Sequence, residues 1–330
     1  MRVMVTGANG LVGRALVQRL LALGQLNGRP ISRLLLLDQA LNDLPADPRL
    51  RFYAGTVTEA ALFRRSLADG VDVVFHLAGV PCVEAEGNYA LGNQVNLKAS
   101  LELLDQLRLL PRPAVLVYAS SVAVYGGALP SRMGELERPR PVTSYGAHKL
   151  MVETAICDLS RRGELDGRVV RLPTIVARAQ EAGGLRSGFM GELMHAVASN
   201  QPYRCPVSPH ITSWWMSAVC CVDNLLHAAQ LDTSTIGRDR VWQLPVLHLS
   251  VEDIVTALVT RYGHERRELV SYAPDPALEH LLGEFPPIKT TLARALGFRH
   301  DGGPSGLLRN VLSSVVASRR AAKTVGVLQP

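Results

Sequence analysis

Short apolar runs alternate with amphipathic stretches along the first half of the chain. The apolar runs fall at 2–7, 33–38, 50–55, 72–79 and 114–121. Stretches with helical spacing of apolar residues lie between them, at 11–24, 58–70 and 94–110. This alternation predicts a parallel sheet with helices on both faces. The apolar runs lack a polar–apolar alternation of their own, as expected of strands that are covered on both faces.

The second half continues this pattern and then departs from it. We predict a strand at 168–176, an irregular segment at 177–215, a helix at 221–231 and a last sheet strand at 241–246. Helical stretches and a proline-rich segment follow from 250 onward. The expected fold class is therefore α/β, a doubly wound parallel sheet. We expect a nucleotide-binding domain at 1–172, to which 218–246 returns, and a smaller substrate-binding part at 173–217 and 247–330.

Composition and charge narrow the class of protein. The chain has 330 residues, of which 47% are hydrophobic and 19% charged, which is typical of a globular protein with a sizeable core. Its net charge of +6 comes from scattered basic residues without interleaved aromatic side chains, so we expect no nucleic-acid partner. The longest apolar runs are too short to cross a bilayer, and no signal peptide is expected. We therefore expect no membrane partner.

The cysteines indicate the compartment. There are five, and none forms a CxxC pair. Adjacent Cys220 and Cys221 fit neither a zinc site nor an ordinary disulfide framework. We therefore expect a cytoplasmic protein without a bound metal.

Three glycines follow the first apolar run at three-residue spacing, at Gly7, Gly10 and Gly13. Glycine allows a tight turn and a close approach of the backbone to a pyrophosphate, and the helix that follows offers free N–H groups. The second strand ends in Asp38, whose carboxylate can accept both ribose hydroxyls and repels a 2′-phosphate. These features predict a Rossmann-like site for NAD. The polar insert at 24–30, expected to be a surface loop, accounts for the long spacing from Gly13 to Asp38.

A tyrosine and a lysine stand four residues apart in the stretch TSYGAHKLMVE. Positions i and i+4 share one face of a helix, so Tyr145 and Lys149 project to the same side. A cation beside a phenol favours the phenolate and lowers its pKa, which would make Tyr145 a general base. Taken alone, the pair fits a packed tyrosine and a solvated lysine better than a catalytic pair.

Together these motifs carry a resemblance to a known family. The chain has TGxxGxxG at 6–13, HLAG at 76–79, YASSVAVYGG at 118–127 and YGAHK at 145–149. With them it resembles the extended short-chain dehydrogenases/reductases, also called NAD-dependent epimerases/dehydratases. The resemblance implies that Tyr145 is the catalytic base, Lys149 its cationic partner and Ser121 the third catalytic residue. It also implies a homodimer, formed by helices at 91–109 and 145–162.

The resemblance further implies a set of cofactor-binding residues. Asn96 matches an asparagine that positions the next strand and active-site waters, and Gly55-Thr56 stands where many members have Gly-Asp, so the adenine contact differs. The cofactor-binding residues expected are Gly7, Asn9, Gly10, Leu11, Val12, Gly13, Asp38, Thr56, Val57, Leu77, Ala78, Gly79, Asn96, Tyr145, Lys149, Leu172 and Thr174.

The substrate follows from a narrower likeness. The segment RLPTIVAR at 171–178 lacks the asparagine and YGP turn of nucleotide-sugar enzymes. It is instead similar to a subgroup that oxidises the C2 hydroxyl of a four-carbon, D-erythronate-like sugar acid to a 2-oxo acid. Two departures stand out: Cys82 replaces a usual serine, and 217–222 lacks the subgroup's arginines. The substrate residues expected are Cys82, Ser121, Tyr145 and, as a carboxylate clamp, Arg178 and Arg186.

Two alternatives to the sugar-acid dehydrogenase stay open. The first is a nucleotide-sugar epimerase or dehydratase of the same family, in which the ketone is kept and reduced again. The second is a protein that senses NAD without catalysis, although such a protein has no need of a base like Tyr145.

Overall fold

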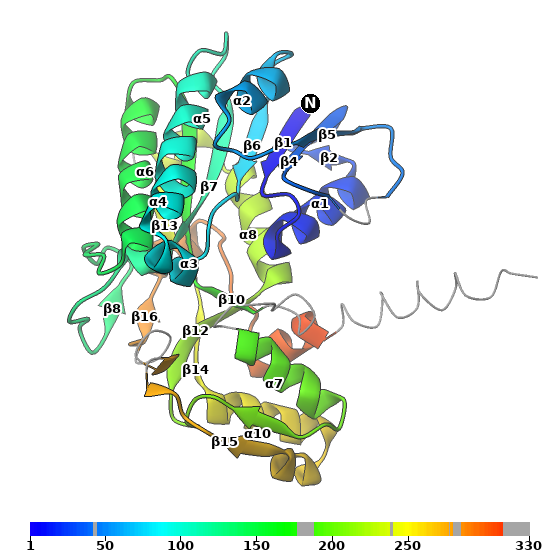
Figure 1. Ribbon diagram of the computed structural model, residues 1–330, viewed down its shortest axis with the longest axis vertical. Coiled ribbons are helices and arrows are strands. Elements are labelled where there is room, and N and C mark those ends of the chain that lie inside the picture. Colours follow the sequence, from blue (N-terminus) through cyan, green and yellow to red (C-terminus); the bar gives the residue numbers. More distant parts are fainter. Residues whose placement is uncertain (42–44, 177–187, 238–239, 277, 280–284, 313–330) are drawn as a thin grey trace, which may run out of the picture.

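The computed structural model of the protein describes residues 1–41, 45–176, 188–237, 240–276, 278–279 and 285–312 (Figure 1). Its centre is a seven-stranded parallel sheet. From edge to edge the order is β13 (Val241–Gln243), β9 (Asp166–Leu172), β7 (Val115–Ser121), β6 (Val73–His76), β1 (Arg2–Thr6), β4 (Arg33–Asp38) and β5 (Leu50–Ala54). The chain progresses outward from β1 in both directions, which confirms the predicted doubly wound α/β fold.

The strand residues alternate between two hydrophobic clusters, one on each face of the sheet. Val3 and Val5 belong to the cluster beneath α1 (Leu11–Leu23) and α8 (Ala218–Gln230), whereas Met4 belongs to the other. The second cluster lies beneath α2 (Ala60–Leu67), α5 (Ala99–Leu107) and α6 (Ser144–Arg161). Because side chains point to opposite faces with period two, apolar residues at every strand position bury both faces at once.

The parallel strands bring the predicted motifs together at their carboxyl ends. Thr6 at the end of β1 pairs with Leu37 of β4 and with His76 of β6, and Ser121 of β7 pairs with Leu172 of β9. The winding direction of the chain reverses between β1 and β6. In open α/β sheets, ligands bind at this switch point, beyond the carboxyl ends of the strands.

Three short helical segments connect β6 to α5. They are α3 (Cys82–Gly87), α4 (Tyr89–Gly92) and the π-helical η1 (Asn93–Lys98). The predicted helix at 94–110 therefore starts with a π-helical turn, a form that is frequent at functional sites.

The insert at 24–30 differs from the prediction, because it is a β-hairpin and not a loop. Strands β2 (Gln25–Leu26) and β3 (Arg29–Pro30) pair across Asn27 and Gly28, whose φ angles are 54° and 69°. Two residues with positive φ are what a tight type I′ turn requires, and Asn-Gly is its preferred pair.

The segment after β9 also differs from the prediction. The expected strand at 168–176 breaks at Pro173, which lacks an N–H, into β9 and β10 (Thr174–Val176). Strand β10 joins a second sheet with β12 (Thr212–Ser217) and β14 (Leu247–Ser250). The described part of 177–215 is not irregular, since it contains α7 (Phe189–Ala198) and β11 (Tyr203–Cys205), which pairs with β15 (Val270–Tyr272).

A third hydrophobic cluster lies under the C-terminal elements. It joins α7, α10 (Val251–Tyr262) and a helix at 304–312. This separate core agrees with a smaller C-terminal part, whose boundaries stay a prediction. The remaining described elements are η2 (Val122–Val124), β8 (Met133–Gly134), α9 (Thr233–Ile236), η5 (His264–Leu269), β16 (Ile288–Lys289) and α12 (Thr291–Ala295).

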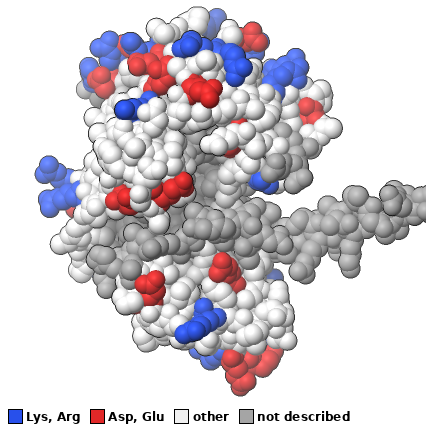
Figure 2. Space-filling view, in the orientation of Figure 1, with Lys and Arg blue, Asp and Glu red and all other residues white. Residues whose placement is uncertain are grey.

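The space-filling view shows basic and acidic side chains interspersed over the face it presents (Figure 2). Within the described ranges, no helix is both long enough and apolar enough to cross a membrane.

Candidate active site

The glycine turn after β1 is pressed against the segment that follows β6. Gly7 has a φ of 68°, and a Cβ there would lie 2.7 Å from the Ala78 nitrogen. A Cβ on Gly13 would lie 2.1 Å from the Gly7 carbonyl oxygen. Helix α1 starts after Gly10 without a side-chain cap, so its first N–H groups remain available. A bare turn in front of an uncapped helix fits a pyrophosphate, the group that NAD would place there.

Asp38 lies beside this turn. Its carboxylate accepts hydrogen bonds from the Asn9 backbone at 2.8 Å and from the Gln39 backbone at 2.7 Å. Each oxygen keeps a free lone pair for a ribose hydroxyl. The Asn9 side-chain oxygen is buried without a hydrogen-bond partner in the described structure, which is the kind of orphaned group that a ligand donor would satisfy. These residues fit the adenosine half of NAD.

The predicted adenine contact at Thr56 has a local partner. The Thr56 hydroxyl lies 3.0 Å from that of Thr58, and Val57 is buried against α2. The contact of these two residues with a cofactor stays a prediction.

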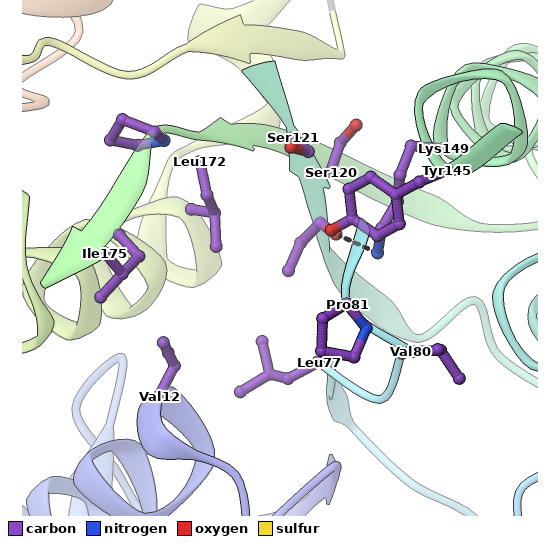
Figure 3. A pocket seen from close by; sticks show the side chains of 13 residues that line it. Val12, Leu77, Val80, Pro81, Ser120, Ser121, Tyr145, Lys149, Leu172 and Ile175 are labelled. Atoms are coloured by element: carbon purple, nitrogen blue, oxygen red, sulfur yellow. Dashed lines mark hydrogen bonds between the residues drawn. The ribbon is translucent and has the colours of Figure 1, made fainter. Parts of the chain in front are cut away.

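A cavity of about 250 Å³ lies beyond the ends of β6, β7 and β9 (Figure 3). Figure 3 shows Leu172 and Ile175 across the cavity from Tyr145 and Lys149. Seven of the predicted residues line it: Val12, Leu77, Gly79, Ser121, Tyr145, Lys149 and Leu172. Six lining residues were not predicted: Val80, Pro81, Ala119, Ser120, Pro173 and Ile175. Each of the six stands within one or two positions of a predicted residue, so the turn geometry, which the sequence does not state, decides which neighbour faces inward.

The other predicted cofactor residues lie outside this lining. Leu11 opens α1, and the Ala78 N–H donates to the Thr6 hydroxyl at 3.2 Å. Thr174 begins β10, between the lining residues Pro173 and Ile175. Their contacts with NAD stay predictions.

Asn96 is buried in η1 and holds the segment after β6. Its side-chain oxygen accepts from the Val80 N–H at 2.7 Å, and its amide donates to the Val80 carbonyl at 3.0 Å. The oxygen and the nitrogen of the Asn96 amide therefore both form hydrogen bonds with the backbone of Val80. Asn96 supports the cavity wall at Val80 from behind.

Helix α6 places both Tyr145 and Lys149 in the lining of the cavity. The Thr143 hydroxyl caps the helix by accepting from the Gly146 N–H at 3.1 Å. A Cβ on Gly146 would lie 2.0 Å from the Ala123 carbonyl oxygen, so only glycine lets the helix start this close to η2. The Lys149 ammonium, on a residue 4% exposed, donates to the Ala119 carbonyl at 2.8 Å and lies 5.6 Å from the centre of the Tyr145 ring.

Burial controls the protonation of the pair. It raises the pKa of Tyr145 to about 12; the nearby Cys82 thiol adds to the rise and a hydrogen bond with Ser121 opposes it. Burial also lowers the pKa of Lys149 to about 8, against the effect of the Glu153 carboxylate. The expectation of a lowered Tyr145 pKa therefore does not hold for the chain by itself, in which the net shift is upward. The cost of desolvating the phenolate is the largest contribution to this shift.

The predicted substrate residues are only partly brought together. Ser121 and Tyr145 both line the cavity. Cys82, in the first turn of α3, is partly exposed, and burial raises the pKa of its thiol, against a hydrogen bond with Thr143. Arg178 and Arg186 lie outside the described residues.

His76 is a neutral structural residue. The Ser100 hydroxyl donates to the Asn96 carbonyl, so it accepts from Nε2 of His76 at 3.0 Å. Nδ1 then accepts from the Thr6 hydroxyl at 2.7 Å. Burial lowers the pKa of His76 to about 3, assisted by the Lys149 charge. The ring therefore adds no charge beneath the cavity.

Sequence reasoning missed the charged residues behind the cavity. Glu153 and Arg171 form an ion pair of 2.7 Å. Glu153 stands one turn beyond Lys149 on the same helix, and this i+4 spacing was the available signal.

Comparisons with known proteins agree with this geometry. A sequence model described as the NAD dependent epimerase/dehydratase family matches residues 3–214. The chain is 34% identical to D-erythronate dehydrogenase of Cupriavidus necator over 314 residues, which is 94% of this chain and 97% of that protein. It is 29% identical to D-erythronate dehydrogenase of Haemophilus influenzae, over 94% of this chain and 99% of that one.

Solved structures show the same architecture. The fold matches that of a nucleoside-diphosphate-sugar epimerase from Agrobacterium tumefaciens with a TM-score of 0.91 and 29% identity, over 96% of this chain and 95% of that one. It also matches L-threonine dehydrogenase from Clostridium difficile with a TM-score of 0.83 and 18% identity, over 96% and 98%. The second likeness is one of fold alone.

Proposed function

The chain belongs to the NAD-dependent epimerase/dehydratase family, and on that premise we propose that it oxidises the C2 hydroxyl of a small, D-erythronate-like sugar acid to a 2-oxo acid. It is an NAD-dependent oxidoreductase. The sugar acid is supported by two relatives named D-erythronate dehydrogenase, each matched over 94% of this chain.

One observation carries the proposal. Ser121, Tyr145 and Lys149 line one cavity, in which the apolar side chains of Leu172 and Ile175 lie across from Tyr145 and Lys149. A hydroxyl donor, a phenol and an ammonium that share a cavity with an apolar wall suit a secondary alcohol held against a flat ring.

In the proposed step, Tyr145 as phenolate takes the proton of the substrate hydroxyl while the Ser121 hydroxyl donates to the same oxygen. Lys149 stabilises the phenolate by its charge. NAD, when bound, supplies the hydride acceptor and a positive ring that favours the phenolate. The C2–H bond breaks with its electron pair leaving as hydride, and a C=O bond remains, so the products are a 2-oxo acid, a proton on Tyr145 and reduced cofactor.

A carboxylate substrate needs a cationic group to bind it. Lys149 is the cation among the cavity-lining residues, and its ammonium already donates to Ala119. We propose that Arg178 or Arg186 binds the carboxylate, since an arginine offers two parallel donors to it. Cys82, next to Tyr145, is proposed to contact the substrate as well.

The nucleotide-sugar alternative is favoured by the 29% identity to the Agrobacterium tumefaciens epimerase. Against it stands RLPTIVAR at 171–178, which lacks the asparagine and YGP turn expected of a diphosphate site.

The deciding experiment is a panel of C4 to C6 sugar acids and UDP-sugars with NAD, followed by NADH absorbance. We expect NADH to accumulate in proportion to a four-carbon sugar acid. Turnover of a UDP-sugar without net NADH would support the epimerase instead. Tight NAD binding with no turnover of any compound would favour a cofactor sensor.

We also propose a homodimer in the cytoplasm. Helices α5 and α6 pack side by side and expose Leu101 and Met151, which are 37% and 46% accessible. These apolar side chains suit a helical interface between two copies. Within the described residues Cys82, Cys205, Cys220 and Cys221 form no disulfide, which suits a reducing compartment.

A further inference from the structure

A buried ion pair lies behind the reacting residues. Glu153 of α6 and Arg171 of β9 are 2% and 8% exposed, and two parallel hydrogen bonds of 3.0 and 2.7 Å join the guanidinium to the carboxylate. Burying two charges costs desolvation energy, so such a pair is weak evidence for stability alone. Its contacts indicate another role.

The ion pair forms hydrogen bonds with residues on both sides of Ser121. The Ser120 hydroxyl donates to Glu153 at 2.5 Å, and the Tyr125 hydroxyl accepts from Arg171 at 2.9 Å. The carbonyl of the preceding residue, Ala119, accepts from Lys149. The stretch that carries Ser121 is therefore fixed to α6, the helix that carries Tyr145 and Lys149.

We infer that Glu153 and Arg171 are positioning residues, which hold the Ser121 hydroxyl in register with Tyr145 and keep a negative charge next to the Lys149 ammonium. The inference rests on the proposed function, in which these three residues act on one alcohol. Neither Glu153 nor Arg171 lines the cavity, so each acts through another residue.

The charges around Lys149 define the electrostatic part of this role. Glu153 and Tyr145, on the same helix as Lys149, face its ammonium. The ring of Tyr118 on β7 lies 4.8 Å from the ammonium, and the charge of Lys149 also acts on His76 of β6. Tyr118 and Tyr145 are neutral below pH 8, and His76 is neutral above its lowered pKa of about 3. Burial lowers the pKa of Lys149 to about 8 and Glu153 opposes this, so loss of the carboxylate should lower that pKa further.

The first test is the double variant Glu153→Met/Arg171→Met. Removing both charges leaves neither member of the ion pair without its partner, so this variant is expected to fold, whereas Glu153→Gln alone leaves Arg171 uncompensated. We expect kcat to fall at least about tenfold with little change in KM, and the alkaline limb of the pH profile to move to lower pH. A kcat and a pH profile equal to those of the wild type would overturn the inference.

A matched control lies on the same strand. Buried Arg168 and partly buried Asp166 form a second ion pair, of 2.8 Å, near the start of β9, away from the cavity, and Asp166 also pairs with Arg240. The variant Asp166→Asn/Arg168→Gln should lose stability without changing kcat or the pH profile. If both double variants lose activity alike, the role of Glu153 and Arg171 is only structural and the inference fails.

The second test does not depend on turnover. The chain has four lysines, so a [¹⁵N]lysine-labelled protein gives few side-chain signals, and Lys149→Arg assigns the one of interest. In NMR titrations we expect the pKa of Lys149 to be lower in Glu153→Met/Arg171→Met than in the wild type. An unchanged pKa of Lys149 would overturn the electrostatic role of Glu153. This result does not require the oxidation of any sugar acid, so it is distinct from a failure of the proposed function.

A conservative variant separates the positioning of Ser121 from the electrostatic effect on Lys149. It also serves as the test if the double variant does not fold. Arg171→Lys keeps both charges but loses the parallel donors to Glu153 and the bond to Tyr125. We expect it to keep the pKa of Lys149 and still lower kcat. Full activity of Arg171→Lys would contradict the positioning role.

Discussion

The carbonyl oxygen of Ala119 accepts a hydrogen bond of 2.8 Å from the Lys149 ammonium. This contact joins the end of β7 to the first turns of α6 and fixes the ammonium 5.6 Å from the centre of the Tyr145 ring. A buried ammonium needs such a partner, because an unpaired charge would cost several kcal/mol. The proposed chemistry depends on this geometry.

Tyr145→Phe should abolish oxidation, with kcat lowered by about 10²–10⁴ because the general base is lost. NAD affinity should change by less than about tenfold, since one hydrogen bond contributes about 1 kcal/mol. NADH formation and NAD titration measure the two effects. Tyr262→Phe, on α10, is the control and should have no effect; substantial activity in Tyr145→Phe would refute the assignment.

The folded-state pKa of Lys149, about 8 against an ordinary 10.5, predicts how stability depends on pH. Between these values the unfolded chain binds more protons than the folded one, so this contribution to stability rises with pH. The free energy of unfolding of the wild type minus that of Lys149→Met should therefore increase, by on the order of 3 kcal/mol across that window. Denaturant unfolding at several pH values measures it, with Lys289→Met as the control. A pH-independent difference would contradict the shift.

Gly13→Ala should disrupt the glycine turn, because the new Cβ would lie 2.1 Å from the Gly7 carbonyl oxygen. We expect stability to fall by about 1–3 kcal/mol, as for other overpacked sites, and NAD to bind more weakly. Gly87→Ala is the matched control, since no atom lies within 4 Å of its added Cβ. Equal thermal unfolding and NAD binding in the two variants would show that the close contact is unimportant.

Asp38→Ala should reduce the preference for NAD over NADP. The carboxylate is proposed to accept the ribose hydroxyls, and hydrogen bonds to charged groups contribute about 1.5–3 kcal/mol, or roughly 10- to 100-fold. Dissociation constants for both cofactors measure the ratio. Asp69→Ala, in the exposed turn after α2, should leave the ratio unchanged. An unchanged ratio in Asp38→Ala would place the discrimination elsewhere.

The sequence determined the features that depend on local periodicity. Apolar runs gave the strands, the three-residue glycine spacing gave the turn, and the i+4 spacing put Tyr145 and Lys149 on one helix face. Each rule acts over fewer than ten residues, so a pattern in the chain suffices. The choice of Ser121 came from motifs that resemble a family, and Ser121 lines the same cavity as Tyr145 and Lys149.

Tertiary structure alone decided the rest. Ser120 reaches Glu153 across 33 positions of sequence, and Arg171 reaches Tyr125 across 46. Such contacts have no local pattern, because they arise where separate strands end at one edge of the sheet. The direction of the Tyr145 pKa shift was likewise beyond the sequence: spacing predicts a neighbouring cation, but only packing determines how much water the phenol loses, and here that loss dominates.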